Sequence, residues 1–180
     1  MSVLSPSFTG KTGISSSGPA FLEKMKARVE SGLLTGKPHR RARYVVTRHT
    51  QQELAFRASD FITAINVGLN EVSLRAVGDG TVEYSVRYQR WAAYVVGLGA
   101  LLGGAFVVAF LFWDIGAQVE RYPLVGDPAL NRSVGLAALW ALIAFWALVW
   151  PWLLVMMHRP AARRLLERII RDVDVATPLP

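Results

Sequence analysis

The chain has 180 residues, of which 52% are hydrophobic and 18% are charged, and its formal net charge is +7. It contains no Cys, which excludes disulfides, thiolate metal sites, cysteine catalysis and palmitoylation. Its three His are far apart in the sequence, so we expect neither a histidine metal site nor a cofactor. The apolar residues are concentrated in two blocks, which predicts a membrane protein.

The chain begins with three segments of different composition. Residues 1–18 are rich in Ser, Gly and Thr, which predicts a disordered tail. Residues 19–36 predict an amphipathic helix, because Pro19 suits a first helical turn and apolar residues then recur at helical spacing. Residues 37–43 form a basic linker. Its cations are candidates for binding anionic lipid headgroups: Lys37, Arg40, Arg41 and Arg43.

Residues 44–90 predict a small cytoplasmic α+β domain with the order strand, helix, strand, strand. Tyr44–His49 predicts the first strand, and Thr50 with Glu53 matches a capping box that would begin a helix over residues 54–69. Alternating apolar residues on either side of a Gly-Asp-Gly turn then predict a hairpin. Because so short a segment is close to the lower size limit of an independent core, we expect it to lean on the membrane surface, a second copy or a partner.

Two uncharged apolar segments, residues 91–113 and 134–157, are each long enough to cross a bilayer as a helix. Residues 114–133 between them predict an extracytoplasmic loop. The predicted fold class is therefore a membrane α-helical hairpin of two transmembrane helices, with the small α+β domain and flanking amphipathic helices. Aromatic residues near the segment ends are candidates for membrane-interface belts: Trp91, Tyr94, Trp113, Trp150 and Trp152.

Lys and Arg are distributed unequally about the two apolar segments. Residues 1–90 contain 13, the loop contains 2, and residues 158–180 contain 5. The positive-inside rule then places both termini in the cytoplasm. The excess of Arg over Lys favours a bacterial source, and hence the plasma (bacterial inner) membrane. Residues 158–180 predict an amphipathic helix in the membrane interface, followed by a short tail. Its first cations are further candidates for binding anionic lipid: Arg159, Arg163 and Arg164.

Small residues in both apolar segments predict close contacts between helices. They are Gly99, Gly103 and Gly104 in the first segment and Ala137, Ala141 and Ala144 in the second. Packing between the two spans of one chain, self-association, and docking on another membrane protein all fit this pattern. In the second span, Pro151 predicts a kink, which is either static or a hinge.

Three short motifs give little evidence for a specific site. The tripeptide at residues 10–12 resembles only the end of a phosphate-binding loop, since Ser5 stands where that motif needs Gly. Asn131 begins a glycosylation sequon in the predicted outer loop. His49 and Asp60 flank the predicted helix of the small domain, but a catalytic pair would need a third group and a pocket.

The composition of the two spans bears on function. Neither contains an ionisable residue, or any Ser, Thr, Asn or Gln, whereas transporters and pumps usually carry ionisable groups within the membrane. We therefore predict a non-enzymatic accessory, anchoring or scaffold subunit of a larger membrane complex. Its expected partners are membrane lipids, including anionic headgroups, and other membrane protein subunits or itself. Nucleic acid is not expected, because the basic side of the protein faces an anionic membrane. The alternative is a small homo-oligomeric channel with an apolar pore.

Overall fold

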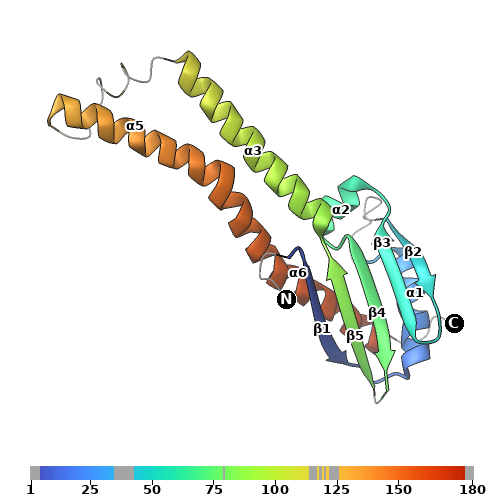
Figure 1. Ribbon diagram of the computed structural model, residues 1–180. Coiled ribbons are helices and arrows are strands. Elements are labelled where there is room, and N and C mark those ends of the chain that lie inside the picture. Colours follow the sequence, from blue (N-terminus) through green and yellow to red (C-terminus); the bar gives the residue numbers. More distant parts are fainter. Residues whose placement is uncertain are drawn as a thin grey trace. The chain divides into compact units, whose positions relative to one another are not determined.

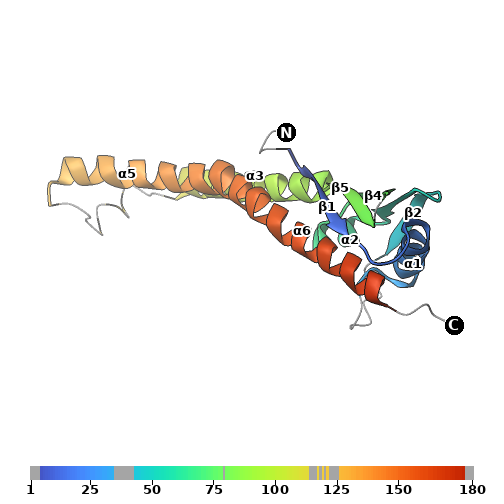
Figure 2. The same ribbon diagram turned by 90° about the horizontal axis from the view of Figure 1, so that it is seen from below.

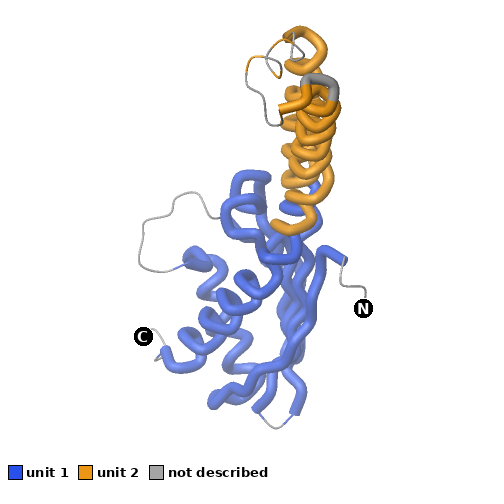
Figure 3. Tube along the Cα trace, turned by 90° about the vertical axis from the view of Figure 1, so that its left-hand side faces the viewer, with its two compact units in different colours: residues 1–93, 155–180 blue, residues 94–154 orange. Residues whose placement is uncertain are grey.

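The computed structural model describes residues 5–34, 43–78, 80–113, 117, 119, 121 and 126–176, except for the side chains of residues 128 and 129 (Figure 1). The chain forms two compact units, coloured separately in Figure 3. Unit 1 comprises residues 1–93 and 155–180, and unit 2 comprises residues 94–154. Unit 1 is therefore discontinuous in sequence: the chain leaves it, forms unit 2 and then returns.

Unit 1 is built on one five-stranded antiparallel sheet. The strands are β1 (Ser7–Gly13), β2 (Tyr44–His49), β3 (Glu53–Ala58), β4 (Glu71–Val77) and β5 (Thr81–Arg87). Their order across the sheet is β1-β5-β4-β3-β2, and every neighbouring pair is antiparallel (Figures 1 and 2). In β3 and β5 buried residues alternate with more exposed ones, so one face of the sheet belongs to the core.

The prediction of a disordered tail over residues 1–18 is wrong, because β1 is a full edge strand. It pairs with β5 along its whole length, from Ser7 opposite Arg87 to Gly13 opposite Thr81. Phe8 is the one buried side chain of the strand, and its ring packs against the rings of Tyr84 and Tyr88. A segment rich in Ser, Gly and Thr gives little local signal for a strand, so the pairing partner decides its structure.

The predicted helix over residues 54–69 is also wrong in its first half, which forms β3. The hydroxyl of Thr50 does accept the backbone N–H of Glu53, at 3.0 Å, but this bond closes the β2–β3 hairpin rather than a helix. The helix is confined to α2 (Phe61–Val67). Asp60 caps its first turn by accepting the N–H of Thr63 at 2.7 Å.

Two helices from opposite ends of the chain cover the core face of the sheet. They are α1 (Gly18–Ser31) and the part of α6 (Trp150–Val175) that belongs to unit 1. The apolar side chains of both lie in the same buried cluster as those of the strands. They are Phe21, Leu22, Met25 and Val29 of α1, and Leu166, Ile169, Ile170 and Val173 of α6. The prediction that the apolar face of the C-terminal helix lies in the membrane interface is therefore wrong, because the sheet already buries that face.

The C-terminal end of α6 is fixed to the β1–α1 connection by hydrogen bonds. The carboxylate of Asp174 accepts the backbone N–H groups of Ser15, at 2.7 Å, and Ser16, at 2.9 Å. Nearby, Lys24 donates to the backbone carbonyl of Ala176 at 2.9 Å. Desolvation alone would raise the pKa of Asp174, but the two N–H donors outweigh it and the pKa is lowered.

We expect Asp174→Asn to lower the free energy of unfolding by about 1 kcal/mol at neutral pH, since an amide replaces a charged acceptor of two N–H groups. Because the folded-state pKa is lowered, the carboxylate stabilises the fold above its unfolded pKa of about 4, and this contribution is lost as pH falls below it. Urea unfolding at pH 7 and pH 3 tests this. Asp172→Asn, an exposed position on the same helix, is the control. A difference between the Asp174 variant and the parent that does not shrink at pH 3 would contradict the assignment.

Unit 2 is a helical hairpin. It contains most of α3 (Gln89–Phe112), α5 (Pro128–Ala144), the single π-helical segment η1 (Phe145–Val149) and the start of α6. Two helices, Gln89–Phe112 and Leu130–Val175, are long and apolar enough to cross a membrane. Only 17% of each apolar window is buried. The π-helical segment η1 ends two residues before Pro151, where the sequence predicts a kink.

Candidate functional site

The small residues predicted to pack helices fall into two groups. Gly99 and Gly103 are buried in unit 2, where a Cβ atom would lie 2.2 Å from the Pro151 ring and 2.5 Å from the Ala147 side chain, respectively. A Cβ atom on Gly104 would meet nothing within 4 Å. The three remaining candidates are exposed and take no part in this contact: Ala137, Ala141 and Ala144. The contact residues Ala147 and Pro151 are four apart and lie on either side of the end of the π turn, so they form a different stripe of the second helix.

We expect Gly103→Leu to destabilise the hairpin by about 1–3 kcal/mol, because the added side chain has to displace Ala147. Gly104→Leu adds the same atoms one residue further on, where there is open space, and is the matched control. The apparent melting temperature of the detergent-solubilised protein measures both. Equal effects of the two variants would show that Gly103 does not lie in a close helix contact.

The cations predicted to bind anionic lipid are not gathered into one site. Lys37, Arg40 and Arg41 lie outside the described residues. Arg43 and Arg164 are exposed, and Arg159 is half-buried. Arg163 is committed to an ion pair with Glu167, at 2.8 Å.

The predicted aromatic belt divides between the two units. The Trp91 ring belongs to unit 1 and stacks on the ring of His158, with centroids 3.9 Å apart. Trp150 is half-buried beside Phe145 and Trp146, at centroid distances of 6.2 and 5.4 Å. The remaining candidates are exposed in unit 2: Tyr94, Trp113 and Trp152.

A buried polar cluster, which the sequence analysis missed, holds the start of α3 within unit 1. The side chain of Asn70 donates to the carbonyl of Ala64 at 2.8 Å and accepts the backbone N–H of Trp91 at 3.1 Å. His158 lies against Gly68, with Nε2 3.3 Å from the glycine carbonyl oxygen. Gly68 has φ +74° and ends α2, so it needs both the left-handed conformation and the absence of a side chain. This cluster is structural, since the side chains of Asn70 and His158 hydrogen-bond to backbone groups.

The three short motifs each have a structural role. Lys11, in the tripeptide at residues 10–12, lies on β1 and pairs with Glu83 at 2.7 Å, so no phosphate-binding loop exists there. The amide of Asn131 is buried and donates to the carbonyl of Val119 at 2.9 Å. His49 lies 3.4 Å from a carboxylate oxygen of Glu23, whereas Asp60 caps α2, so the two do not form a catalytic pair.

The feature of unit 1 that stands out is the sheet face opposite the core, which we call the polar face. The three adjacent strands β3, β4 and β5 carry the same pattern there, Glu-x-(Ser/Ala)-x-Arg: ELAFR at residues 53–57, EVSLR at 71–75 and EYSVR at 83–87. A search for short repeats at strand spacing would have found it. No described part of unit 1 covers this face, and two shallow hollows of about 740 and 480 Å³ lie over it.

Because neighbouring strands are antiparallel, the repeat places the residues of the polar face in three rows across the sheet. Row 1 consists of Lys11, Glu83, Arg75 and Glu53. Row 2 consists of Thr9, Ser85, Ser73 and Ala55. Row 3 consists of Ser7, Arg87, Glu71 and Arg57. Charges of alternating sign thus border a middle row of small side chains.

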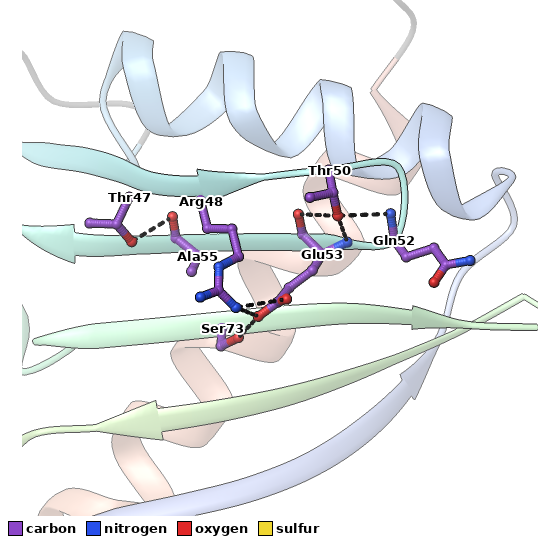
Figure 4. A network of polar contacts seen from close by, with 7 residues as sticks. All are labelled: Thr47, Arg48, Thr50, Gln52, Glu53, Ala55 and Ser73. Carbon is purple, nitrogen blue, oxygen red and sulfur yellow. Dashed lines mark hydrogen bonds and ion pairs between the residues drawn. The ribbon is translucent and has the colours of Figure 1, made fainter.

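The carboxylates of the polar face are engaged by cations or hydroxyls. Arg48 lies 3.2 Å from one carboxylate oxygen of Glu53, and the other oxygen accepts a hydrogen bond from the Ser73 hydroxyl at 3.2 Å (Figure 4). The hydrogen bond and charge of Lys11 lower the pKa of Glu83. No described group of three His, Cys, Asp or Glu side chains could hold a metal ion. Paired carboxylates and small hydroxyls suit recognition of another surface better than acid–base chemistry.

No family model matches the chain, and no curated protein and no solved structure is significantly similar to it. The case for a function therefore rests on the geometry of the two units.

Proposed function

We propose that this protein is a two-span membrane protein that acts as an accessory, anchoring or scaffold subunit of a larger membrane complex. One observation carries the proposal: the apolar windows of the two long helices are largely exposed. Only 17% of each window is buried, whereas most large apolar side chains of the sheet and of α1 lie in the buried core of unit 1. A lipid bilayer, or the helices of other subunits, is the environment in which such helices are stable.

The fold of unit 1 supports the topology that the Lys and Arg counts predict. Its two sequence segments, residues 1–93 and 155–180, share one core, so both have to lie on the same side of a membrane. Two spans satisfy this condition because the chain crosses and returns. The positive-inside rule makes this side the cytoplasm.

The topology can be tested by labelling cells with a membrane-impermeant maleimide, since the chain has no native Cys to remove. We expect Gly126→Cys to be labelled from outside. Ser31→Cys and Val175→Cys should react only after the inner membrane is opened; these positions lie in the two segments of unit 1. Labelling of all three positions in intact cells, or of none, would overturn the two-span arrangement.

The scaffold role is tested by gentle extraction from native membranes, with measurement of mass and identification of co-purifying chains. We expect other membrane proteins at a fixed ratio. Ala137→Leu/Ala141→Leu/Ala144→Leu keeps the second helix apolar but reshapes a surface that the hairpin does not use, so it should release a partner bound there. Recovery of no partner would overturn the proposal. A homo-oligomer that conducts ions in planar bilayers would support an apolar-pore channel instead.

A further inference from the structure

Rows 1 and 3 of the polar face have opposite charge patterns. Along β5 the two charged residues are Glu83 and Arg87, and β4 has the reverse arrangement in space, with Arg75 beside Glu83 and Glu71 beside Arg87. On β3, Glu53 again lies in row 1 and Arg57 in row 3. Across these three strands, row 1 therefore reads acid, base, acid, while row 3 reads base, acid, base.

We propose that the polar face is a self-association surface that binds the polar face of a second copy of this chain. The two copies would be related by a two-fold axis that runs along row 2, parallel to the sheet and perpendicular to the strands. This rotation places row 1 of one copy over row 3 of the other. Opposite charges then meet at all three strands. The facing pairs are Glu83 with Arg87, Arg75 with Glu71, and Glu53 with Arg57.

The charge pattern selects this axis over the other two-fold axis that lies in the plane of the sheet. A rotation about an axis parallel to the strands, through β4, would place Arg75 opposite its own copy and Glu83 opposite Glu53. Like charges would then face each other in row 1, which opposes binding. An unrelated partner would place no such requirement on the rows. The inversion of sign between rows 1 and 3 is what a self-complementary surface needs.

The ion pairs within one copy leave charge available to the second. Arg57 and Arg75 form no ion pair among the described residues, although Arg75 lies close enough to lower the pKa of Glu83. In the dimer they would face Glu53 and Glu71. On β1, β5, β4 and β3, row 2 has only short side chains, so these strands can approach those of the second copy to the usual spacing of about 10 Å. On β2, Arg48 lies opposite Ala55 in line with row 2, and its guanidinium is paired with Glu53. An interface of this composition retains water and is weakened by salt.

Cross-linking of single-Cys variants of the full chain with a short bismaleimide tests the geometry, because sheets about 10 Å apart hold facing residues too far apart for a direct disulfide. Ser73 lies on the proposed axis, so Ser73→Cys should be cross-linked to its own copy. Val77 is exposed on the same strand and the same face, about 14 Å further along. The two copies of Val77→Cys should therefore stay about 27 Å apart and not link. We expect at least tenfold more linked dimer for Ser73→Cys, falling with added salt. Equal linking of both variants, or none by Ser73→Cys, would overturn the proposal.

A charge-exchanged chain separates self-association from simple stabilisation of the sheet. Its substitutions exchange the signs of rows 1 and 3 and keep every ion pair within the sheet: Lys11→Glu, Arg48→Glu, Glu53→Arg, Arg57→Glu, Glu71→Arg, Arg75→Glu, Glu83→Arg and Arg87→Glu. With Ser73→Cys added, this chain should link to itself but not to the unexchanged Ser73→Cys chain, because like charges would face each other at all three strands. Equal amounts of mixed and matched dimers would overturn the proposal. Matching melting temperatures of the two chains confirm that both are folded.

The self-association proposal is independent of the proposed scaffold role. A partner subunit recovered from native membranes without linking by Ser73→Cys would leave the scaffold role standing and remove the dimer. Linking by Ser73→Cys without recovery of any foreign partner would leave the dimer standing and remove the scaffold role.

Discussion

A chain that ends after Arg164 is expected to lose the folded structure of unit 1. The deletion removes four α6 side chains that are at most 4% exposed: Leu166, Ile169, Ile170 and Val173. Burying each is worth about 1.5–3 kcal/mol, or about 6–12 kcal/mol together. The whole stability of a domain is only about 5–15 kcal/mol, so the remaining sheet should not hold its core.

Limited proteolysis of the detergent-solubilised protein measures this loss. Trypsin should cut the truncated chain rapidly after Arg57 and Arg75, which lie within strands of the intact sheet. A chain that lacks only residues 177–180 is the control, since it keeps all four core side chains, and it should be cut as slowly as the full chain. Equal protection of the full chain and the chain that ends after Arg164 would show that α6 is a peripheral helix, as the sequence alone predicts.

Gly10→Val is expected to have the second largest effect, because the ring of Tyr84 crosses β1 at this residue. A Cβ atom at position 10 would lie 2.2 Å from the Tyr84 hydroxyl oxygen, which donates a hydrogen bond to Glu167 at 2.5 Å. The substitution has to displace the ring and break this bond to a carboxylate. Overpacking costs about 1–3 kcal/mol, and loss of a charged hydrogen bond costs about as much again. We expect a total loss of about 3 kcal/mol in the free energy of unfolding.

Gly13→Val is the matched control for this prediction. It lies on the same strand, and the nearest atom to its Cβ would be the carbonyl oxygen of Gly80, at 3.9 Å. Since Val favours strands, the control should be neutral or slightly stabilising. Urea unfolding compares both variants with Tyr84→Phe, which removes the hydroxyl without filling the space. If Gly10→Val were no worse than Gly13→Val, the approach of Tyr84 to β1 would be incorrect.

The elements with strong local signals could be predicted from the sequence. The two long apolar helices, the hairpin of β4 and β5, strand β2 and the start of the first helix near Pro19 follow from run length, alternation and helical spacing. Each of these signals lies within a short stretch of chain, so no knowledge of distant partners is needed.

The elements that depend on distant partners could not be predicted in this way. Leu54 and Ala58 fit both a helical and a strand spacing. Residues 53–58 form strand β3 because they pair with β4. The edge strand β1 exists only because β5 offers it a partner, and the C-terminal helix has an amphipathic face that suits a membrane surface and a sheet equally well. The domain predicted from the sequence, residues 44–90, is therefore too small. Strand β1, helix α1 and part of helix α6 also belong to it, and all three lie outside the predicted boundaries.

The candidate surface on the sheet was missed for a related reason. Each Glu-x-(Ser/Ala)-x-Arg segment is an ordinary strand when it is considered alone. Its charges acquire a pattern only when antiparallel pairing sets three such segments in register. Opposite charges across neighbouring strands also stabilise the sheet itself, so the same residues serve folding and, in our proposal, self-association.

The discontinuity of unit 1 also has a consequence for biosynthesis. During translation, residues 1–93 emerge first, and the whole of unit 2 is made before the ribosome reaches the part of α6 that completes the core. Until then the sheet has helix α1 but lacks Leu166, Ile169 and Ile170, so part of its apolar face is open to water and to chaperones. Closure of the core is therefore a late event with high contact order, because it pairs side chains of residues 1–93 with side chains of α6 that are made after unit 2.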